Sequence, residues 1–371
     1  MCFLLHYTLS EADELHIDRC YYSHSMLAAI FRLALGHQHS MILMQGGSVW
    51  ITLLGLFPSL DVSKYFVQMM GSGAVAMAAG EGYCLVLKGG GHVWAVGRNS
   101  NGQLGDGTVV RREKFTFVKQ IPGAKDLAAG VGHSMILTQE GQVLATGWNK
   151  YGQLGCGFQQ KSRVFVPVIS GGAIAIAAGD LHSIVVKQDG SVWATGRNDH
   201  SQLGDGSQHD RRTFVKVVAG GAKAATAGSY HSMVLKQDGS VLAVGWNKVG
   251  QLGDGPAMDR INYVQVVPGG AKTIAAGSRH SMVLKGDGSV WVTGCNNDGQ
   301  LGDGSTSNRY IFMEVVSDVV TGVAAGAVHS MVVKEDGSVW ATGSNKFGQF
   351  GYHLAVNENI FTELKPVHYG A

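Results

Sequence analysis

The chain has 371 residues, of which 45% are hydrophobic and only 15% charged, so it can bury a large core and is not a disordered chain. Its 29 basic and 27 acidic residues leave a formal net charge of +2, which gives no electrostatic reason to expect nucleic acid or a membrane as the main partner. The 54 glycines are about twice what average usage supplies, and they imply many tight turns.

Residues 1–29 are expected to be a short N-terminal extension. Their apolar run has no basic n-region and no small-residue cleavage site, so we expect no signal peptide, and no apolar stretch is long enough to predict a transmembrane helix. The five cysteines are irregularly spaced and predict no disulfide framework. We therefore expect an intracellular protein, and no basic cluster distinguishes the cytoplasm from the nucleus.

A repeat begins near residue 30 and continues to the end of the chain. A glycine, two variable residues and then His-Ser recur at intervals of 44, 50, 49, 49, 49 and 49 residues. The glycines are Gly36, Gly80, Gly130, Gly179, Gly228, Gly277 and Gly326. The sequence therefore predicts one domain of seven units over residues 30–371.

Each unit is expected to supply four short strands. In residues 231–245, apolar segments flank Asp238-Gly239, which predicts a tight hairpin. A corner of the form NxxGQLGDG follows, then a third strand such as residues 212–218, and the small-residue run AAG supplies the fourth. Four strands per unit without helical periodicity favour an all-β, seven-bladed propeller. We expect its ring to close by joining the N- and C-terminal segments in one blade, as an open edge would be left otherwise.

The sequence G-x-x-H-S, D-G-S-V-W-A-T-G and N-x-x-G-Q-L-G-D-G resembles the regulator-of-chromosome-condensation repeat, over roughly residues 30 to 371. The chain also resembles the β-lactamase inhibitor protein II superfamily. These families share a seven-bladed propeller but have unrelated tasks, among them nucleotide exchange on a small GTPase. In the exchange factor, acidic residues between the glycine and the histidine help to act on the GTPase. Asp180 matches that motif, and Glu81 matches it in part.

The recurring histidines favour a structural role. One histidine per blade around a ring cannot converge on a metal ion, so we expect each imidazole to bond a neighbouring backbone group or serine. The serine after each histidine points to the opposite face of its strand, which argues against a nucleophile–base pair. We expect no catalytic residue, no metal and no cofactor.

The glycine-rich corners lack the lysine and helix of a phosphate-binding loop. The arginines that follow them are interpreted as ties to the recurring aspartates, here Asp106, Asp205, Asp254 or Asp303; a basic ring for an acidic partner is the alternative. The tryptophans of the Val-Trp pairs are expected to pack between blades.

Variable positions on a repeated scaffold favour recognition of a partner. The pairs between glycine and histidine vary freely and should cluster on one face, as should the residue before Asn in each corner. These two positions give eight candidate binding residues: Glu81, Asp180, Tyr230, Arg279, Arg98, Trp148, Arg197 and Trp246. We predict a non-enzymatic module that binds a protein; nucleotide exchange on a small GTPase is the alternative. The oligomeric state is not predicted.

The first unit is degenerate. Residues 48–70 have lost the NxxGQLGDG corner and carry an apolar loop instead. That loop is a docking patch, a decayed blade or a gene-model error, and the last two are the plainer interpretations.

Overall fold

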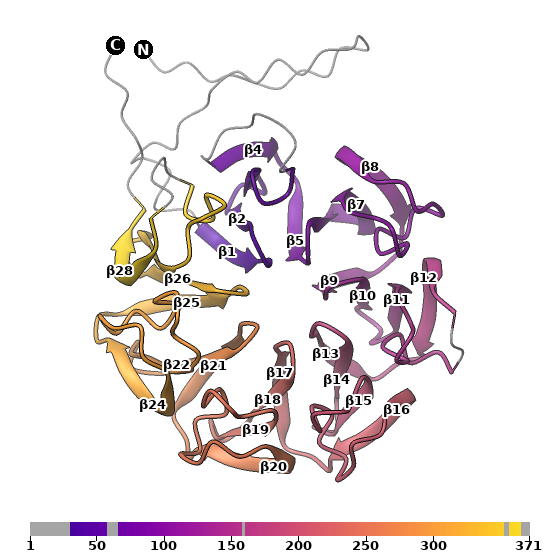
Figure 1. Cartoon of the computed structure of the whole chain (residues 1–371). Helices are drawn as coiled ribbons and strands as arrows, with labels where there is room; N and C mark the ends of the chain where they lie inside the picture. Colours follow the sequence, from indigo (N-terminus) through magenta and orange to yellow (C-terminus); the bar gives the residue numbers. More distant parts are fainter. Residues whose placement is uncertain (1–29, 58–65, 158–159, 352–355, 365–371) are drawn as a thin grey trace, which may run out of the picture.

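The computed structural model describes residues 30–57, 66–157, 160–351 and 356–364. Seven sheets of four antiparallel strands form blades around one axis, as Figure 1 shows. The 3-10 turn η2 (Gly89–Gly91) is the one helical element within these ranges, and none of the described residues forms a helix long and apolar enough to cross a membrane. The predicted all-β, seven-bladed propeller is confirmed.

Each blade contains four strands that are consecutive in the sequence, with the first strand nearest the axis. Blades 1 to 3 contain β1 (Ile30–Leu35), β2 (Ser40–Met44), β3 (Val49–Thr52) and β4 (Phe66–Met70); β5 (Ala74–Ala79), β6 (Tyr83–Lys88), β7 (His92–Gly97) and β8 (Arg112–Gln120); and β9 (Ala124–Ala129), β10 (His133–Thr138), β11 (Val143–Gly147) and β12 (Ser162–Ile169).

The other four blades follow the same order. They contain β13 (Ala173–Ala178), β14 (His182–Lys187), β15 (Val192–Gly196) and β16 (Arg211–Val218); β17 (Ala222–Ala227), β18 (His231–Lys236), β19 (Val241–Gly245) and β20 (Arg260–Val267); β21 (Ala271–Ala276), β22 (His280–Lys285), β23 (Val290–Gly294) and β24 (Arg309–Val316); and β25 (Val320–Ala325), β26 (His329–Lys334), β27 (Val339–Gly343) and β28 (Glu358–Glu363).

The Asp-Gly turn joins the second and third strands as predicted. In blade 5, Asp238 Oδ1 accepts hydrogen bonds from the Ser240 amide at 2.9 Å and the Ser240 hydroxyl at 2.6 Å. Gly239 has a φ of +80°, which a residue with a Cβ adopts only under strain. The turn therefore fixes the register of β18 on β19 through local chemistry alone.

The hydrophobic core lies between the blades. Met233 and Leu235 of β18 pack with Val283 of blade 6, whereas Val234, which points to the opposite face, packs with residues of blade 4. Trp291 and Trp340 pack into the clusters between blades 5 and 6 and between blades 6 and 7. The predicted inter-blade packing of these tryptophans is confirmed.

The ring closes between blades 1 and 7, and within the described residues no sheet combines strands from both ends of the chain. The predicted shared blade is therefore wrong there. The reason is that β1 is already an innermost strand and β28 an outermost one, so the first and last described strands lie on either side of a boundary between blades. Side chains close this boundary, because Ile42 and Trp50 of blade 1 pack against Met331 of blade 7. The predicted extension over residues 1–29 lies outside the described residues.

Blade 1 forms four strands despite its degenerate sequence. Leu53, Leu56 and Phe57 of its apolar loop are at most 5% exposed and belong to the core cluster between blades 1 and 2. The Arg111 guanidinium of blade 2 donates to the Leu56 carbonyl and lies 5.2 Å from the centre of the Phe57 ring. These residues are core, so they do not form a docking patch; residues 58–65 of the same loop lie outside the described ranges.

Candidate functional site

The recurring histidines form a belt of hydrogen bonds that passes from each blade to the next. His231 Nε2 lies 3.0 Å from Ser281 Oγ, and that hydroxyl donates to the Gln251 carbonyl at 2.7 Å. Because the serine proton is used, the histidine donates through Nε2–H. The equivalent links are His133–Ser183, His182–Ser232, His280–Ser330 and His329–Ser40, with His39–Cys84 and Tyr83–Ser134 in the two remaining places.

This belt confirms the structural interpretation of the histidines. His-Ser pairs do form, but between neighbouring blades rather than within one strand. Burial lowers the pKa of each belt histidine to about 3 or about 4, so all six are neutral at neutral pH. Each serine is fully buried, and all of them except Ser40 donate their hydroxyl hydrogen to a backbone carbonyl. The pairs therefore hold blades together and present no nucleophile.

The recurring glycines stand where the inner strands approach one another and the belt. A Cβ on Gly228 would lie 2.3 Å from the ring of His231 and 2.4 Å from the carbonyl oxygen of Gly277 in the next blade. The other six glycines of the repeat have the two equivalent neighbours, the histidine of their own blade and the carbonyl oxygen of the repeat glycine in the next blade, with Tyr83 in place of histidine at Gly80. Close packing around the axis therefore explains the most regular residue of the repeat.

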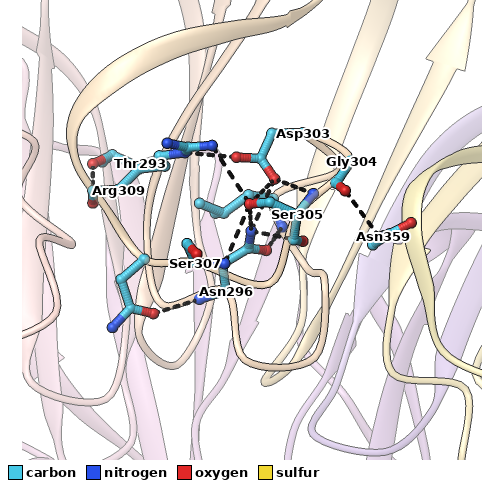
Figure 2. A network of polar contacts seen from close by, with 10 residues as sticks. Thr293, Asn296, Asp303, Gly304, Ser305, Ser307, Arg309 and Asn359 are labelled. Carbon is cyan, nitrogen blue, oxygen red and sulfur yellow. Dashed lines mark hydrogen bonds and ion pairs between the residues drawn. The ribbon is translucent and has the colours of Figure 1, made fainter.

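The glycine-rich corner contains a network of polar contacts, which Figure 2 shows for blade 6. Asp303 is fully buried and accepts from Arg309 Nε at 2.6 Å and from Asn296 Nδ2 at 2.9 Å. Desolvation by burial would raise the pKa of the Asp303 carboxyl, but its hydrogen bonds to Ser305, Arg309 and Asn296 outweigh it and lower the pKa. The same tie forms in Asp106–Arg112, Asp205–Arg211 and Asp254–Arg260.

The predicted arginine–aspartate tie is thus confirmed in four blades, and blade 3 shows what happens without it. There Cys156 stands in place of the aspartate, and Ser162 has the register position of the arginine. Asn149 Nδ2 donates to Cys156 Sγ at 3.3 Å instead of to a carboxylate. Both charged partners are absent together, which avoids leaving one buried charge unpaired.

The eight candidate binding residues lie at one end of the propeller, which we call the loop end. It carries the loops after the first and third strands of each blade. Backbone hydrogen bonds join these loops within a blade: Arg98, Trp148, Arg197 and Trp246 donate through N–H to the carbonyls of Gly82, Gly132, Leu181 and Tyr230 at 2.7–2.9 Å. Each candidate residue from a corner therefore lies beside the dipeptide of its own blade.

Five of the eight residues belong to one stacked assembly across blades 3 to 6. The Arg197 guanidinium lies 5.5 Å from the Tyr151 ring centre and 5.4 Å from that of Tyr230. Tyr230 meets Trp246 at 6.1 Å, and Arg279 lies 5.4 Å from the Trp246 ring centre. Trp148 extends the assembly through Tyr151, at 5.9 Å between ring centres. We call this set the aromatic–arginine arc: Trp148, Tyr151, Arg197, Tyr230, Trp246 and Arg279.

Sequence reasoning missed Tyr151 and His200, which packs on Tyr230 at 4.9 Å between ring centres. Both occupy the position two residues after the corner asparagine, where other units carry Asn101, Val249, Asp298 or Phe347. The variability of this position within an otherwise constant corner could have identified Tyr151 and His200 as candidate binding residues.

The other three candidate residues lie outside the arc, and all three are paired. Glu81 Oε2 accepts from Arg98 Nη1 at 3.2 Å, with both side chains more than one third exposed. Asp180 Oδ1 lies 3.2 Å from Nε2 of His37, which comes from blade 1 on the far side of the axis. Desolvation by burial disfavours the charged forms of both groups, but their hydrogen bond and mutual attraction outweigh it. The pKa of His37 is therefore raised and the pKa of Asp180 is lowered.

The described residues contain no group of three histidine, cysteine, aspartate or glutamate side chains that could hold a metal ion. The arrangement at the loop end offers flat aromatic surface, guanidinium groups and carboxylates, among them Glu81, Asp180 and Asp199, the last of which pairs with Arg197. Tryptophan, tyrosine and arginine are residue types that recur at protein interfaces.

Comparisons with known proteins extend these observations. The chain resembles the structure of human WBSCR16, with a TM-score of 0.72 and 23% identity over 82% of this chain and 86% of that one. It also resembles Prp20p from Saccharomyces cerevisiae, with a TM-score of 0.70 and 21% identity over 78% and 76% of the two chains. Yeast RCC1 (Prp20) bound to Kap60 gives a TM-score of 0.74 and 18% identity, over 96% and 91%. At these identities the likeness shows the fold.

Comparison with curated protein sequences found no significant match. The family model of the RCC1-like domain matches residues 13–316, and the model of the regulator of chromosome condensation (RCC1) repeat matches residues 320–349. The first match covers well over half of the chain. The chain belongs to the RCC1-like domain family.

Proposed function

We propose that this chain is a non-enzymatic interaction module that binds a protein partner through the aromatic–arginine arc at its loop end. The proposal rests mainly on one observation. Six side chains from four blades stack on one another, and they occupy positions that vary between the repeat units. Tryptophan, tyrosine and arginine are the residue types that most often dominate binding energy at protein interfaces.

The stacking also supports the proposal energetically. A guanidinium held between two rings, as Arg197 is between Tyr151 and Tyr230, has already lost rotamer freedom before a partner arrives. Less side-chain entropy then remains to be lost on association. The arginine–aspartate ties in the corners of blades 4, 5 and 6 hold these parts of the arc on a rigid scaffold. A location in the cytoplasm or nucleus belongs to the same proposal and is supported by the free thiols of Cys84, Cys156 and Cys295.

Affinity capture with cross-linking tests this function. Wild-type protein, Arg197→Ala and Trp246→Ala would be used as baits, with Phe117→Ala as the matched control. Phe117 is 46% exposed and meets Trp94 edge-on at 5.6 Å, but it lies on the outermost strand of blade 2. We expect the arc variants to lose a partner that wild-type and Phe117→Ala retain. Equal retention by all four baits would contradict the proposal.

Nucleotide exchange on a small GTPase is the second candidate. It is favoured by Asp180 and Glu81 at the loop end, where the family resemblance expects acidic residues, and by the likeness to Prp20p, whose structure was reported with its binding properties to Gsp1p and histones. A panel of small GTPases carrying fluorescent nucleotide would be mixed with the protein. Accelerated release by wild type that falls in Asp180→Ala and Glu81→Ala would support exchange, whereas unaltered release from every member removes this candidate.

A further inference from the structure

The axis of the ring opens at the loop end into a pocket of about 80 Å³ to which all seven blades contribute. Each blade supplies the glycine of its repeat and, in six blades, the alanine before it. Blade 1 has Leu35 at that place. Most of the wall therefore consists of glycine and alanine, and Leu35, His37 and Asp180 are its larger side chains.

Two ionisable side chains stand at this pocket, His37 and Asp180. They come from blades 1 and 4, nearly opposite each other in a ring of seven, and meet at 3.2 Å. Both remain partly exposed, with 30% and 22% of their side-chain surface accessible. The pair therefore spans the mouth of the pocket without being sealed inside the protein.

The pair places an imidazole of this chain, which is a cation when protonated, against the Asp180 carboxylate of the pocket. Asp180 is anchored, because its amide donates to the Gly228 carbonyl at 3.3 Å and its carboxylate bonds Ser229. Glu81 adds a second negative charge that acts on His37 from blade 2. The imidazole, in contrast, is held here by a single polar contact, which rotation of its side chain would break.

We propose that the axial pocket accepts an arginine side chain from a protein partner, with Asp180 as its counter-ion and His37 as the group it displaces. An arginine is favoured over lysine because its planar fork can make two parallel bonds to one carboxylate and because the guanidinium is weakly hydrated. The narrow wall of small residues admits an unbranched side chain end-on. This inference rests on the loop end being the partner-binding end, and it specifies the chemistry that the partner must present there.

Fluorescence polarisation with a defined probe tests the pocket on the full chain. The probe is a fluorescein-labelled Gly-Gly-Arg-Gly-Gly amide, and its control carries citrulline, which has the shape of arginine without the charge. His37→Ala should bind the arginine peptide about tenfold more tightly than wild type, because the internal competitor is gone. Asp180→Asn should abolish that binding, and the citrulline peptide should gain nothing in any variant.

Two further variants keep the test decisive. Asp238→Asn removes a carboxylate from the opposite end and should leave peptide binding unchanged. His37→Gln keeps a hydrogen-bond donor but no charge, and should give an affinity between wild type and His37→Ala. Thermal melts check that each variant is folded. Equal binding of both peptides to His37→Ala, or no gain in that variant, overturns the pocket. If arc variants still lose a captured partner, the interaction function stands and only the arginine pocket fails.

Discussion

Tyr230 and His231 are neighbours in the sequence but lie in different environments, one at the surface of the loop end and the other in the interior. His231 is fully buried and bonds Ser281 of the next blade at 3.0 Å, whereas Tyr230 is half-buried and stacks on Trp246 of its own blade. The histidine is present in six of the seven units, whereas a tyrosine stands at the position of Tyr230 in this unit alone. A side chain that links two blades is thus the same around the ring, and a side chain that faces solvent at the loop end is free to differ.

The largest expected effect comes from lowering the pH, which acts on the belt and not on the arc. The six belt histidines titrate at about 3 or about 4 when folded and near 6.5 when unfolded. Below about pH 6.5 the unfolded chain binds more protons, so stability falls as the pH falls, by about 1.4 kcal/mol per histidine and pH unit. His37 has a raised pKa and acts in the opposite direction, but it is one group against six.

Six such groups together remove about 8 kcal/mol per pH unit, against a typical stability of about 5–15 kcal/mol. We therefore expect unfolding with a midpoint between about pH 5 and pH 6. Urea unfolding followed by circular dichroism across this range measures how the free energy of unfolding changes with pH. His231→Gln should reduce that pH dependence by about one sixth, because one of the six histidines is removed. A ring that stays fully folded at about pH 4 would show that the belt is not neutral as described.

Truncating the two neighbours separately sharpens the comparison at one site. His231→Ala removes a fully buried ring and its bond to Ser281, so we expect a loss of about 2–4 kcal/mol in the free energy of unfolding. Tyr230→Ala removes only an edge-on stack at the surface, and should cost less than about 1 kcal/mol. Denaturant unfolding at neutral pH measures both. Similar losses for the two variants would mean that the belt bond contributes no more than the surface stack.

The corner network gives a smaller effect than the belt because it reaches solvent. Asp303→Asn keeps the shape of the side chain but removes the charge that Arg309 pairs with, and Arg309 itself is 37% exposed. We expect a loss of about 1–2 kcal/mol, measured by thermal melting. Cys156→Ser in blade 3, where the tie is already absent, is the control and should change stability by less than about 0.5 kcal/mol. A Cys156 variant as costly as Asp303→Asn would contradict the importance of the tie.

The fold was accessible from the sequence because its main causes are local and repeated. Turns such as Asp238-Gly239 and the regular spacing of the axial glycines are enough to predict seven blades of four strands. The way in which the ring closes could not be predicted from the sequence, because the repeat has the same period whichever strand is counted as the first of a blade. Its phase depends on where the chain leaves one blade for the next, and the inner strand proved to be the first of each blade.

Only part of the candidate site could be predicted, because a comparison of the units shows which positions vary but not which side chains meet. The variable positions lie together at one end of the ring, as their variation between units predicted. That variation carries no information on contacts between distant blades. His37 and Asp180 are 143 residues apart and meet because the ring curves back on itself. The arc likewise depends on how neighbouring corners face one another, which one unit considered alone does not reveal.

The smallest expected effect on stability falls in the arc, where binding should change instead. Arg279 is exposed and lies over Trp246, and its charge has no carboxylate partner among the ion pairs of the described residues. Arg279→Ala should therefore alter the free energy of unfolding by less than about 0.5 kcal/mol. At an interface anchor the same change should weaken partner binding by about tenfold or more.

Arg279→Lys then separates charge from shape, because lysine keeps the charge but has no planar group to stack on the indole. If the arc binds through its stacked surface, Arg279→Lys should lose nearly as much affinity as Arg279→Ala, measured by titration against the captured partner. Full affinity in the lysine variant would assign the arc a purely electrostatic role, and its binding would then weaken steeply with added salt. Unchanged affinity in both variants would place Arg279 outside the interface. The binding surface would then comprise only the part of the arc in blades 3 to 5.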